Sequence, residues 1–145
     1  GNYLNGILAV NEIRGTRYHE VLLLDSVGNI AEGSGENVFF AKAGALHTPK
    51  LGAILPGITR ATIIALARDE GIAVHERDIS PSEAFDSDEA FFTGTAAEVT
   101  PIRSIDDRIL GKGEVGPITR RLRQLYLDVV RGRDPRHSGF LTKVG

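Results

Sequence analysis

Two carboxylates and an amide stand among small residues in the stretch Ala31-Glu-Gly-Ser-Gly-Glu-Asn-Val-Phe-Phe40. Gly33 and Gly35 have no β-carbon, so a ligand could come close to this backbone. Glu32 and Glu36 would then offer an acidic partner to a basic group of that ligand. The alternative is a hairpin with solvated acids at its turn, because glycine and polar residues between apolar runs are typical of turns.

A second stretch with chemical potential is Leu55-Pro-Gly-Ile-Thr-Arg60, which is typical of a helix that begins directly after a glycine. The first amides of a helix lack partners inside it, and its dipole is positive at that end. Such a start can hold a phosphate, and the Thr59 hydroxyl could add a hydrogen bond. Many helices begin with proline and glycine and bind nothing, which is the alternative here.

The third stretch is Gly94-Thr-Ala-Ala97, a turn of small residues at the end of an expected strand. Its consecutive amides could form an anion-binding nest, or the turn could be an ordinary bend. Taken together, the three stretches suggest a site for a flat, anionic, phosphate-bearing ligand whose ring needs an acidic partner.

The composition is that of one globular domain of 145 residues, with 41% apolar and 25% charged residues. A net charge of −2 from 17 basic and 19 acidic residues gives no basic footprint, so nucleic acid and anionic membranes are not expected partners. No apolar run approaches the roughly 20 residues of a membrane span. The absence of cysteine suits a cytoplasmic protein, and four widely separated histidines predict no metal site.

Apolar residues at three- and four-residue steps predict three principal helices. They run from about Asn2 to Arg14, from the Pro56-Gly-Ile-Thr59 start to just before Gly71, and from after Gly116-Pro117 to Arg131. A capping-box spacing of Ser80 and Glu83 predicts a short helix from Pro81 to about Phe85. From Gly132 on, we expect a loosely held tail.

Short apolar runs bounded by turn residues predict the strands. These runs are Glu20–Asp25, Ile30–Glu32, Asn37–Lys42, Ala45–Thr48, Ala73–Arg77, Glu89–Thr93, Val99–Ile105 and Ile109–Leu110. Many short strands without regular strand–helix alternation predict a mixed α/β fold with a curved, largely antiparallel sheet.

Four segments resemble the ordered motif set of the class IV, fold-type IV pyridoxal-phosphate aminotransferases, and within them the branched-chain amino-acid enzymes. The segments are Glu32-Gly-Ser-Gly-Glu-Asn-Val-Phe39, Leu55-Pro-Gly-Ile-Thr-Arg60, Gly94-Thr-Ala-Ala-Glu-Val-Thr-Pro-Ile102 and Gly116-Pro-Ile-Thr119. The resemblance covers the chain from Gly1 to about Leu141. It implies the large domain of that fold, a sheet or pseudo-barrel flanked by helices, with pyridoxal 5'-phosphate as cofactor.

The resemblance also implies roles at the cofactor. Glu32 matches the acid that pairs with the pyridine nitrogen and keeps it protonated, so that the ring can accept electrons. Gly57, Ile58 and Thr59 match the phosphate-binding helix start, and Thr95 also matches a position near the phosphate.

On the substrate side, the resemblance implies that the amides of Thr95 and Ala96 receive the substrate carboxylate. Tyr3 matches a tyrosine beside the phenolic oxygen of the cofactor, whereas without the resemblance an aromatic at a helix start would be expected to belong to a core. Glu36 and Asn37 match the motif, and we expect them to shape the site.

One departure concerns the Schiff-base lysine, which the resemblance places a few residues before Gly1. The chain then corresponds to a C-terminal cofactor-binding domain, residues 1–145, without the smaller N-terminal domain and without a catalytic residue of its own. None of the lysines present matches the family position: Lys42, Lys50, Lys112 and Lys143.

The implied activity is amino-group transfer between branched-chain L-amino acids and 2-oxoglutarate, by a homodimer or higher oligomer that includes the N-terminal domain. Two other functions stay open. One is another class IV enzyme, a D-amino-acid aminotransferase or an aminodeoxychorismate lyase. The other is a non-catalytic partner domain that binds phosphate-bearing ligands.

Overall fold

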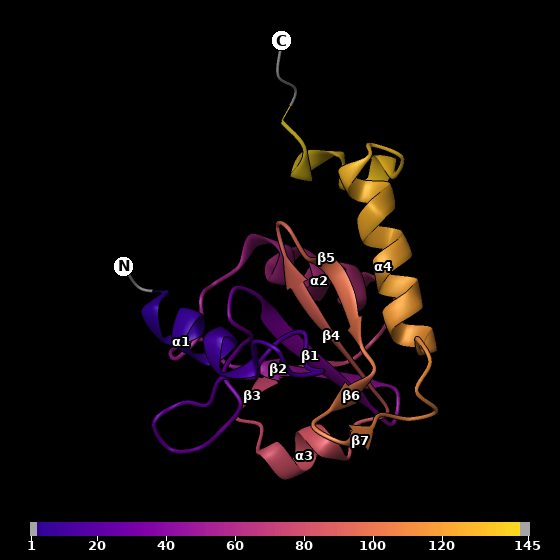
Figure 1. Ribbon diagram of the computed structural model, residues 1–145. Helices are drawn as coiled ribbons and strands as arrows, with labels where there is room; N and C mark the ends of the chain where they lie inside the picture. Colours follow the sequence, from indigo (N-terminus) through magenta and orange to yellow (C-terminus); the bar gives the residue numbers. More distant parts are fainter. Residues whose placement is uncertain (1–2, 143–145) are drawn as a thin grey trace.

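The computed structural model describes residues 3–142 and contains a central sheet with helices on both faces (Figure 1). The helices are α1 (Leu4–Ile13), α2 (Ile58–Asp69), α3 (Pro81–Phe85), α4 (Pro117–Val130) and the 3₁₀ helix η1 (Pro135–Phe140). The strands are β1 (Asn37–Lys42), β2 (Ala45–Pro49), β3 (Val74–Arg77), β4 (Glu89–Gly94), β5 (Glu98–Ile102), β6 (Ser104–Ile105) and β7 (Arg108–Ile109).

The main sheet has five strands in the order β3-β2-β1-β4-β5. All neighbours are antiparallel except β2 and β3, which run parallel. The two-stranded β6–β7 hairpin forms a separate sheet. This arrangement confirms the predicted mixed α/β fold with a largely antiparallel sheet. In the described part of the chain the sheet is open, so the pseudo-barrel alternative is not what forms.

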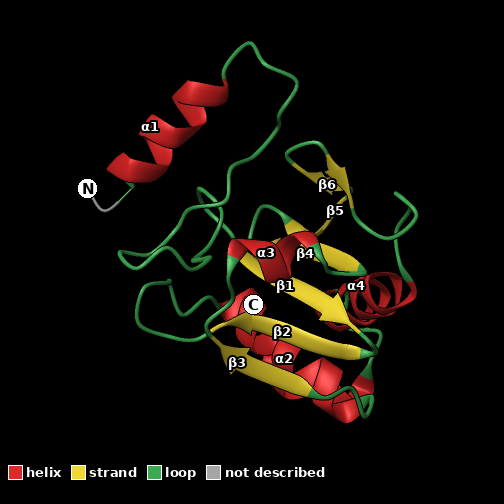
Figure 2. Cartoon of the chain, turned by 90° about the horizontal axis from the view of Figure 1, so that it is seen from below, coloured by secondary structure: helices red, strands yellow, loops and turns green. Residues whose placement is uncertain are grey.

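Strand β1 is buried on both faces because its side chains alternate between two cores. Phe39 packs with residues of α2 and α4. Its ring stacks on the ring of Phe91, with 5.1 Å between the two ring centroids. Val38 and Phe40 face the opposite way, towards α3 and the loop around Ile30. Figure 2 shows the same layers, with α2 and α4 on one face of the sheet and α3 on the other.

Helix α1 confirms the helix predicted at this end of the chain, and its apolar face is exposed. Leu4, Ile7 and Leu8 are between 54% and 61% exposed, and the helix stands to one side of the sheet (Figure 2). Only Gly6 is buried, at a point where a β-carbon would lie 2.7 Å from the Ser34 carbonyl oxygen. Among residues 3–142, no element covers the apolar stripe. The predicted start at Asn2 lies outside the described residues.

The predicted strands Glu20–Asp25 and Ile30–Glu32 do not form, and a single bridge joins Leu24 to Ile30. The turn between them is present, since the Asp25 carboxylate accepts the amides of Val27 and Asn29. The pairing between the two segments is irregular: Asp25 donates to the Asn29 carbonyl, Leu23 bonds to both Ala31 and Glu32, and the Ile30 amide donates outwards to the Ile79 carbonyl. The segment is therefore an irregular hairpin, not a pair of regular strands, and it packs over the α3 side of the sheet.

Two further boundaries differ from the prediction. The expected strand Val99–Ile105 divides into β5 and β6, because the Arg103 carbonyl turns to accept the amide of Leu110. The expected loose tail contains η1, which His137 joins to α2 by a 2.8 Å contact with Asp69.

The capping box of α3 is confirmed, with Ser80 and Glu83 bonding reciprocally. Within residues 3–142, no helix is long and apolar enough to span a membrane.

Candidate functional site

Glu32 lies in the loop before β1, and its side chain is held by two donors. The amide of Leu55 donates to Oε2 at 2.9 Å, and the Asn37 side-chain nitrogen donates to the same oxygen at 3.2 Å. The Asn37 nitrogen also donates to the Leu55 carbonyl at 2.9 Å. Asn37 is buried at the first position of β1, so the strand fixes the loop and the acid together. The other carboxylate oxygen of Glu32, Oε1, receives no hydrogen bond from the described residues and is available to a ligand.

The start of α2 follows directly from the loop that Glu32 holds. Gly57 is the N-cap, and no side chain caps the helix. The amides of Ile58, Thr59 and Arg60 make no hydrogen bond within the described chain, as the first bond of the helix runs from Ala61 to the Gly57 carbonyl. An uncapped start with several free amides is suited to an anion.

Gly57 is required where it stands, because a β-carbon there would overlap the Asn37 side-chain oxygen. The same close approach shows that the α2 start lies directly against Asn37. Glu32, Asn37 and the α2 start therefore form one continuous cradle, which we call the Glu32 cradle. It brings together a carboxylate and a helix start whose first amides have no partner within the described chain.

Arg60 is buried in the second motif, as is Thr59, and the role of Arg60 is structural. Its guanidinium donates to the Pro49 carbonyl and to the Glu76 carboxylate, both at 2.9 Å. These bonds tie the first turn of α2 to β2 and β3, so they orient the free amides relative to the sheet.

Glu36 lies apart from Glu32, on the other side of the bend that the two glycines allow. Its side chain borders Gly33 and Gly94, where added β-carbons would approach it to 3.0 and 3.3 Å. Burial raises the pKa of the Glu36 carboxyl, and the negative charge of Glu20 raises that pKa further. The Glu20 carboxylate in turn accepts the Ser34 amide at 3.2 Å, so these acids brace the bend.

Thr95 and Ala96 lie in the exposed turn between β4 and β5. The turn is closed by Glu98, whose φ of 51° is left-handed, and by a 2.7 Å bond from the Thr100 hydroxyl to the Ala97 carbonyl. The amides of Thr95 and Ala96 make no hydrogen bond within residues 3–142, so the turn presents them to solvent or to a ligand.

Tyr3 is the N-cap of α1 and is 61% exposed. Its carbonyl accepts the Ile7 amide, and Gly6, one turn later, touches the Ser34 backbone. That contact fixes the start of α1 beside the glycine bend. No hydrogen bond joins the Tyr3 side chain to the Glu32 cradle in the described chain.

The fourth motif, Gly116-Pro-Ile-Thr119, is closed where the second is open. The buried Glu89 carboxylate of β4 accepts the amides of Ile118 at 3.1 Å and Thr119 at 2.8 Å. A protein carboxylate thus occupies the start of α4, and this motif fastens the helix to the sheet rather than binding a ligand. Sequence reasoning missed Glu89, because nothing local in the sequence pairs residues 29 positions apart.

Two lysines within residues 3–142 pair with carboxylates outside the Glu32 cradle. Lys42 pairs with Asp86 and Asp88, and Lys50 pairs with Asp78. Lys143 lies outside the described residues. In the described chain, no group of three or more His, Cys, Asp and Glu residues is arranged to hold a metal ion.

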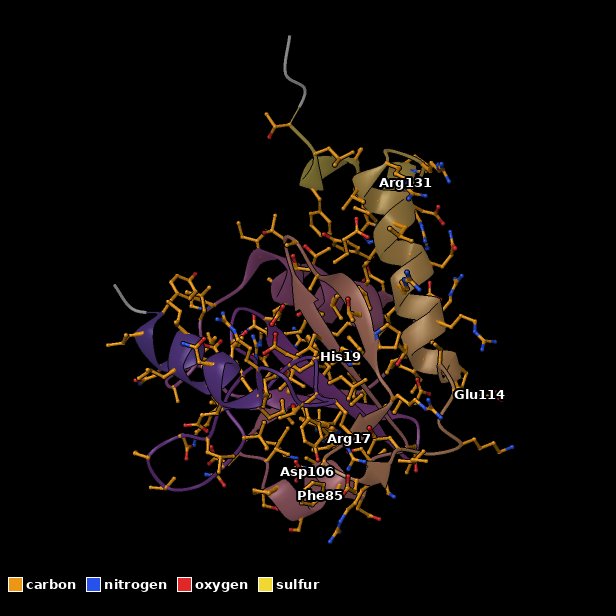
Figure 3. The ribbon with its side chains drawn as sticks, in the orientation of Figure 1. Arg17, His19, Phe85, Asp106, Glu114 and Arg131 are labelled. Carbon is orange, nitrogen blue, oxygen red and sulfur yellow. The ribbon has the colours of Figure 1, made fainter. Side chains whose placement is uncertain are left out.

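Two hollows on the described surface contain none of the predicted site residues. One lies beside His47 and Arg77 at the β2–β3 edge. The other lies between the loop after α1 and the β6–β7 hairpin, and it includes Arg17 and Asp106, which Figure 3 labels. In this second hollow the Arg17 guanidinium pairs with Asp107, so its charge is already balanced.

Fold and site together define an α/β domain that presents a fixed carboxylate beside an uncapped helix start. The family model described as amino-transferase class IV matches residues 1–105. The chain belongs to the class IV amino-transferase family.

Curated relatives carry the same family character over nearly the whole chain. The branched-chain-amino-acid aminotransferase of Pseudomonas aeruginosa is 46% identical over 144 residues, which is 99% of this chain and 47% of that protein. The probable branched-chain-amino-acid aminotransferase of Aquifex aeolicus is 48% identical, with the same coverage. The chain thus spans about half the length of the curated relatives it matches.

Solved structures match the fold closely. The T.th. branched-chain amino acid aminotransferase, complexed with N-(5'-phosphopyridoxyl)-L-glutamate, has a TM-score of 0.96 and 46% identity, covering all of this chain and 48% of its own. The enzyme of Thermobaculum terrenum in its PLP form also has a TM-score of 0.96, with 47% identity over 99% of this chain and 48% of its own.

Proposed function

We propose that this chain is the cofactor-binding domain of a pyridoxal-phosphate-dependent branched-chain aminotransferase. The reaction passes an amino group between branched-chain L-amino acids and 2-oxoglutarate. The relatives at 43% to 48% identity that bear this name support the substrate class. The neighbouring structures with phosphopyridoxyl ligands support the cofactor.

The observation that carries the proposal is the Glu32 carboxylate, which Leu55 and Asn37 hold beside the open start of α2. A pyridine ring with a phosphate needs an acid at one end and an anion site at the other. The cradle offers both. Its unpaired Oε1 is the atom that would accept a hydrogen bond from the protonated ring nitrogen. In the alternative interpretation, a hairpin with solvated acids at its turn, the Glu32 carboxylate would not be hydrogen-bonded to the loop before α2.

The residues present fit the cofactor. Gly57, Ile58 and Thr59 would hold the phosphate, with Thr95 near it, and Glu32 would hold the ring nitrogen. When bound, pyridoxal phosphate supplies an electron sink for the electrons released at the substrate Cα. The carboxylate of Glu32 favours the protonated ring nitrogen, because an adjacent negative charge stabilises a positive one.

The substrate side rests on the β4–β5 turn and on α1. The free amides of Thr95 and Ala96 would receive the substrate carboxylate, as donors to an anion. Tyr3 would stand beside the phenolic oxygen of the cofactor, from the start of α1 that Gly6 fixes against the bend. Glu36 and Asn37 shape the site, Glu36 by bracing the glycine bend and Asn37 by holding Glu32.

In this proposal the Schiff-base lysine and a smaller N-terminal domain belong to the remaining half of the relatives' length. The domain described here is then the C-terminal one, and it contributes no catalytic lysine. The complete enzyme is a cytoplasmic homodimer or higher oligomer.

The test is amino transfer by the protein expressed at its full encoded length. L-Leucine, L-isoleucine and L-valine, each with 2-oxoglutarate, should yield glutamate and the corresponding 2-oxo acid. D-Alanine as the better donor would favour a D-amino-acid aminotransferase, and conversion of aminodeoxychorismate would favour the lyase. Tight binding of pyridoxal phosphate without any of these reactions would favour the non-catalytic domain.

A further inference from the structure

Thr93 carries a buried hydroxyl without a partner at the end of β4. The residue is 1% exposed, and its Oγ1 has no hydrogen bond to any described residue. A buried hydroxyl left unpaired costs about 1–3 kcal/mol, so its presence calls for an explanation. The pairing of the sheet does not explain it, because the ladder bonds of Thr93 are made by its backbone and leave the side-chain hydroxyl unpaired.

The strand geometry directs this hydroxyl towards α2. Side chains alternate along a strand, so Thr93 shares a face with Phe91, which packs in the core formed with α2 and α4. Phe92 lies in the opposite core. Thr93 therefore emerges on the α2 side of the sheet.

The register places Thr93 at the N-terminal end of α2 in particular. Its partner across the sheet is Asn37, and directly opposite residues of antiparallel strands are neighbours. Asn37 in turn lies against Gly57, the N-cap of α2, at the close approach described above. An unpartnered hydroxyl and a helix start with unpartnered amides thus adjoin the same side chain.

A second buried threonine shows why this position is informative. Thr119 is also 1% exposed, and its Oγ1 also lacks a partner within the described chain. It stands at the start of α4, where the Glu89 carboxylate already takes the amides. Thr119 therefore adjoins a closed helix start, whereas Thr93 adjoins an open one.

We propose that Thr93 is a further positioning residue of the anion site, whose hydroxyl acquires its missing hydrogen bond when a phosphate is held at the start of α2. The Thr93 hydroxyl approaches the site from the sheet. It donates a hydrogen bond to an oxygen of the phosphate, or to the Thr59 hydroxyl oxygen that the phosphate orients. This inference rests on the proposed phosphate-binding role of the Glu32 cradle. It adds that the sheet, and not only the helix start, contributes to holding the anion.

The experiment compares Thr93→Val with Thr119→Val in the protein at its full encoded length. Valine keeps the shape and removes the hydroxyl. Thermal unfolding without ligand should show both variants at least as stable as the parent, because each loses an unpaired buried polar group. Titration with inorganic phosphate and with pyridoxal phosphate should show a loss of about tenfold in affinity for Thr93→Val only. Pyridoxal, which lacks the phosphate, should bind both variants as it binds the parent.

Thr93→Ser is the rescue variant, since it restores the hydroxyl and should recover phosphate affinity. Affinities of Thr93→Val within twofold of the parent would overturn the inference while leaving the phosphate site intact. Equal losses for Thr93→Val and Thr119→Val would also overturn it, by showing a general packing effect. If the parent protein itself binds neither phosphate nor pyridoxal phosphate, the proposed function fails first, and this result is distinguishable from both.

Discussion

The side-chain amide of Asn37 donates to the carboxylate of Glu32 at 3.2 Å, which couples the first residue of β1 to the proposed ring-binding acid. The donor is buried, and its nitrogen also holds the loop before α2 through the Leu55 carbonyl. One side chain thus positions both ends of the cradle.

Replacing Asn37 by leucine should disturb the acid and the loop together. Loss of the two part-buried bonds should cost about 1–3 kcal/mol of unfolding free energy, because the Leu55 carbonyl loses the Asn37 donor and one of the two bonds to the Glu32 carboxylate is removed. Pyridoxal-phosphate affinity should fall as well. Urea unfolding with and without the cofactor measures both effects. Asn11→Leu, on the exposed surface of α1, is the control, and equal behaviour of the two variants would contradict the coupling.

Glu32→Gln, in the protein at its full encoded length, should lower the transamination rate much more than cofactor affinity. The amide keeps the shape but not the charge that favours a protonated ring nitrogen. We expect a rate loss on the order of 100-fold, which corresponds to about 3 kcal/mol. Steady-state kinetics with leucine and cofactor titrations measure the two quantities.

Glu36→Gln is the matched control for that experiment. The pKa of Glu36 is raised by burial and by Glu20, so a neutral side chain suits its surroundings. Activity should stay within a few-fold of the parent. Equal losses in the two variants would remove Glu32 from its proposed role.

Thr59→Val should weaken phosphate binding at the start of α2. A charge-assisted hydrogen bond is worth roughly 1.5–3 kcal/mol, so the dissociation constant for inorganic phosphate should rise about 10- to 100-fold. Isothermal titration measures it. Thr62→Val is the control one turn later, since the Thr62 hydroxyl already bonds to the Ile58 carbonyl at 3.0 Å. An unchanged constant for Thr59→Val would place the anion elsewhere.

Gly116→Ala should destabilise the domain without altering the anion site. The added β-carbon would overlap the Glu89 carboxyl carbon, so the carboxylate must leave the start of α4. We expect a loss of about 1–3 kcal/mol, read as a fall of several degrees in Tm. Gly139→Ala, where a β-carbon meets nothing within 4 Å, is the control. A Tm equal to that of the control would show that the capping bonds contribute nothing.

His137 should release η1 from α2 as the pH rises. Its ring nitrogens lie 2.8 Å from Asp69 and 2.9 Å from Asp134, and these two carboxylates raise the pKa of His137 above 6.5. A raised pKa means that the folded state binds the proton more tightly than the unfolded state. The stabilisation is therefore present in full below about pH 6.5, the usual histidine value, and is lost as the pH rises through the folded-state pKa.

The Asp134 carboxylate also pairs with Arg136 of η1. The charge of Arg136 is in turn influenced by Glu70, the C-cap of α2, which pairs with Arg121 of α4. Proton NMR titration should give a pKa for His137 above the usual histidine value of about 6.5. Hydrogen exchange in residues 135–140 should quicken at high pH, and His137→Gln should remove this dependence. An ordinary histidine titration at residue 137 would contradict the prediction.

Several features of this protein follow from the sequence because their causes are local. The capping box of Ser80 and Glu83, the left-handed Gly71 after α2 and the strand Asn37–Lys42 depend on residues within one or two turns of each other. The helix start at Gly57 is equally local. The sequence could therefore predict the fold class and the segments of the site.

Only the tertiary structure determined which of these segments meet. The register of β1 and β4 sets Thr93 opposite Asn37, and Asn37 joins Glu32 to the loop 18 residues further on. Glu89 accepts the first amides of α4, whereas no side chain caps the start of α2, although the two motifs look alike in sequence. Periodicity predicts the helix α1, but only the structure shows that Leu4 is exposed, because burial depends on a partner surface and not on periodicity.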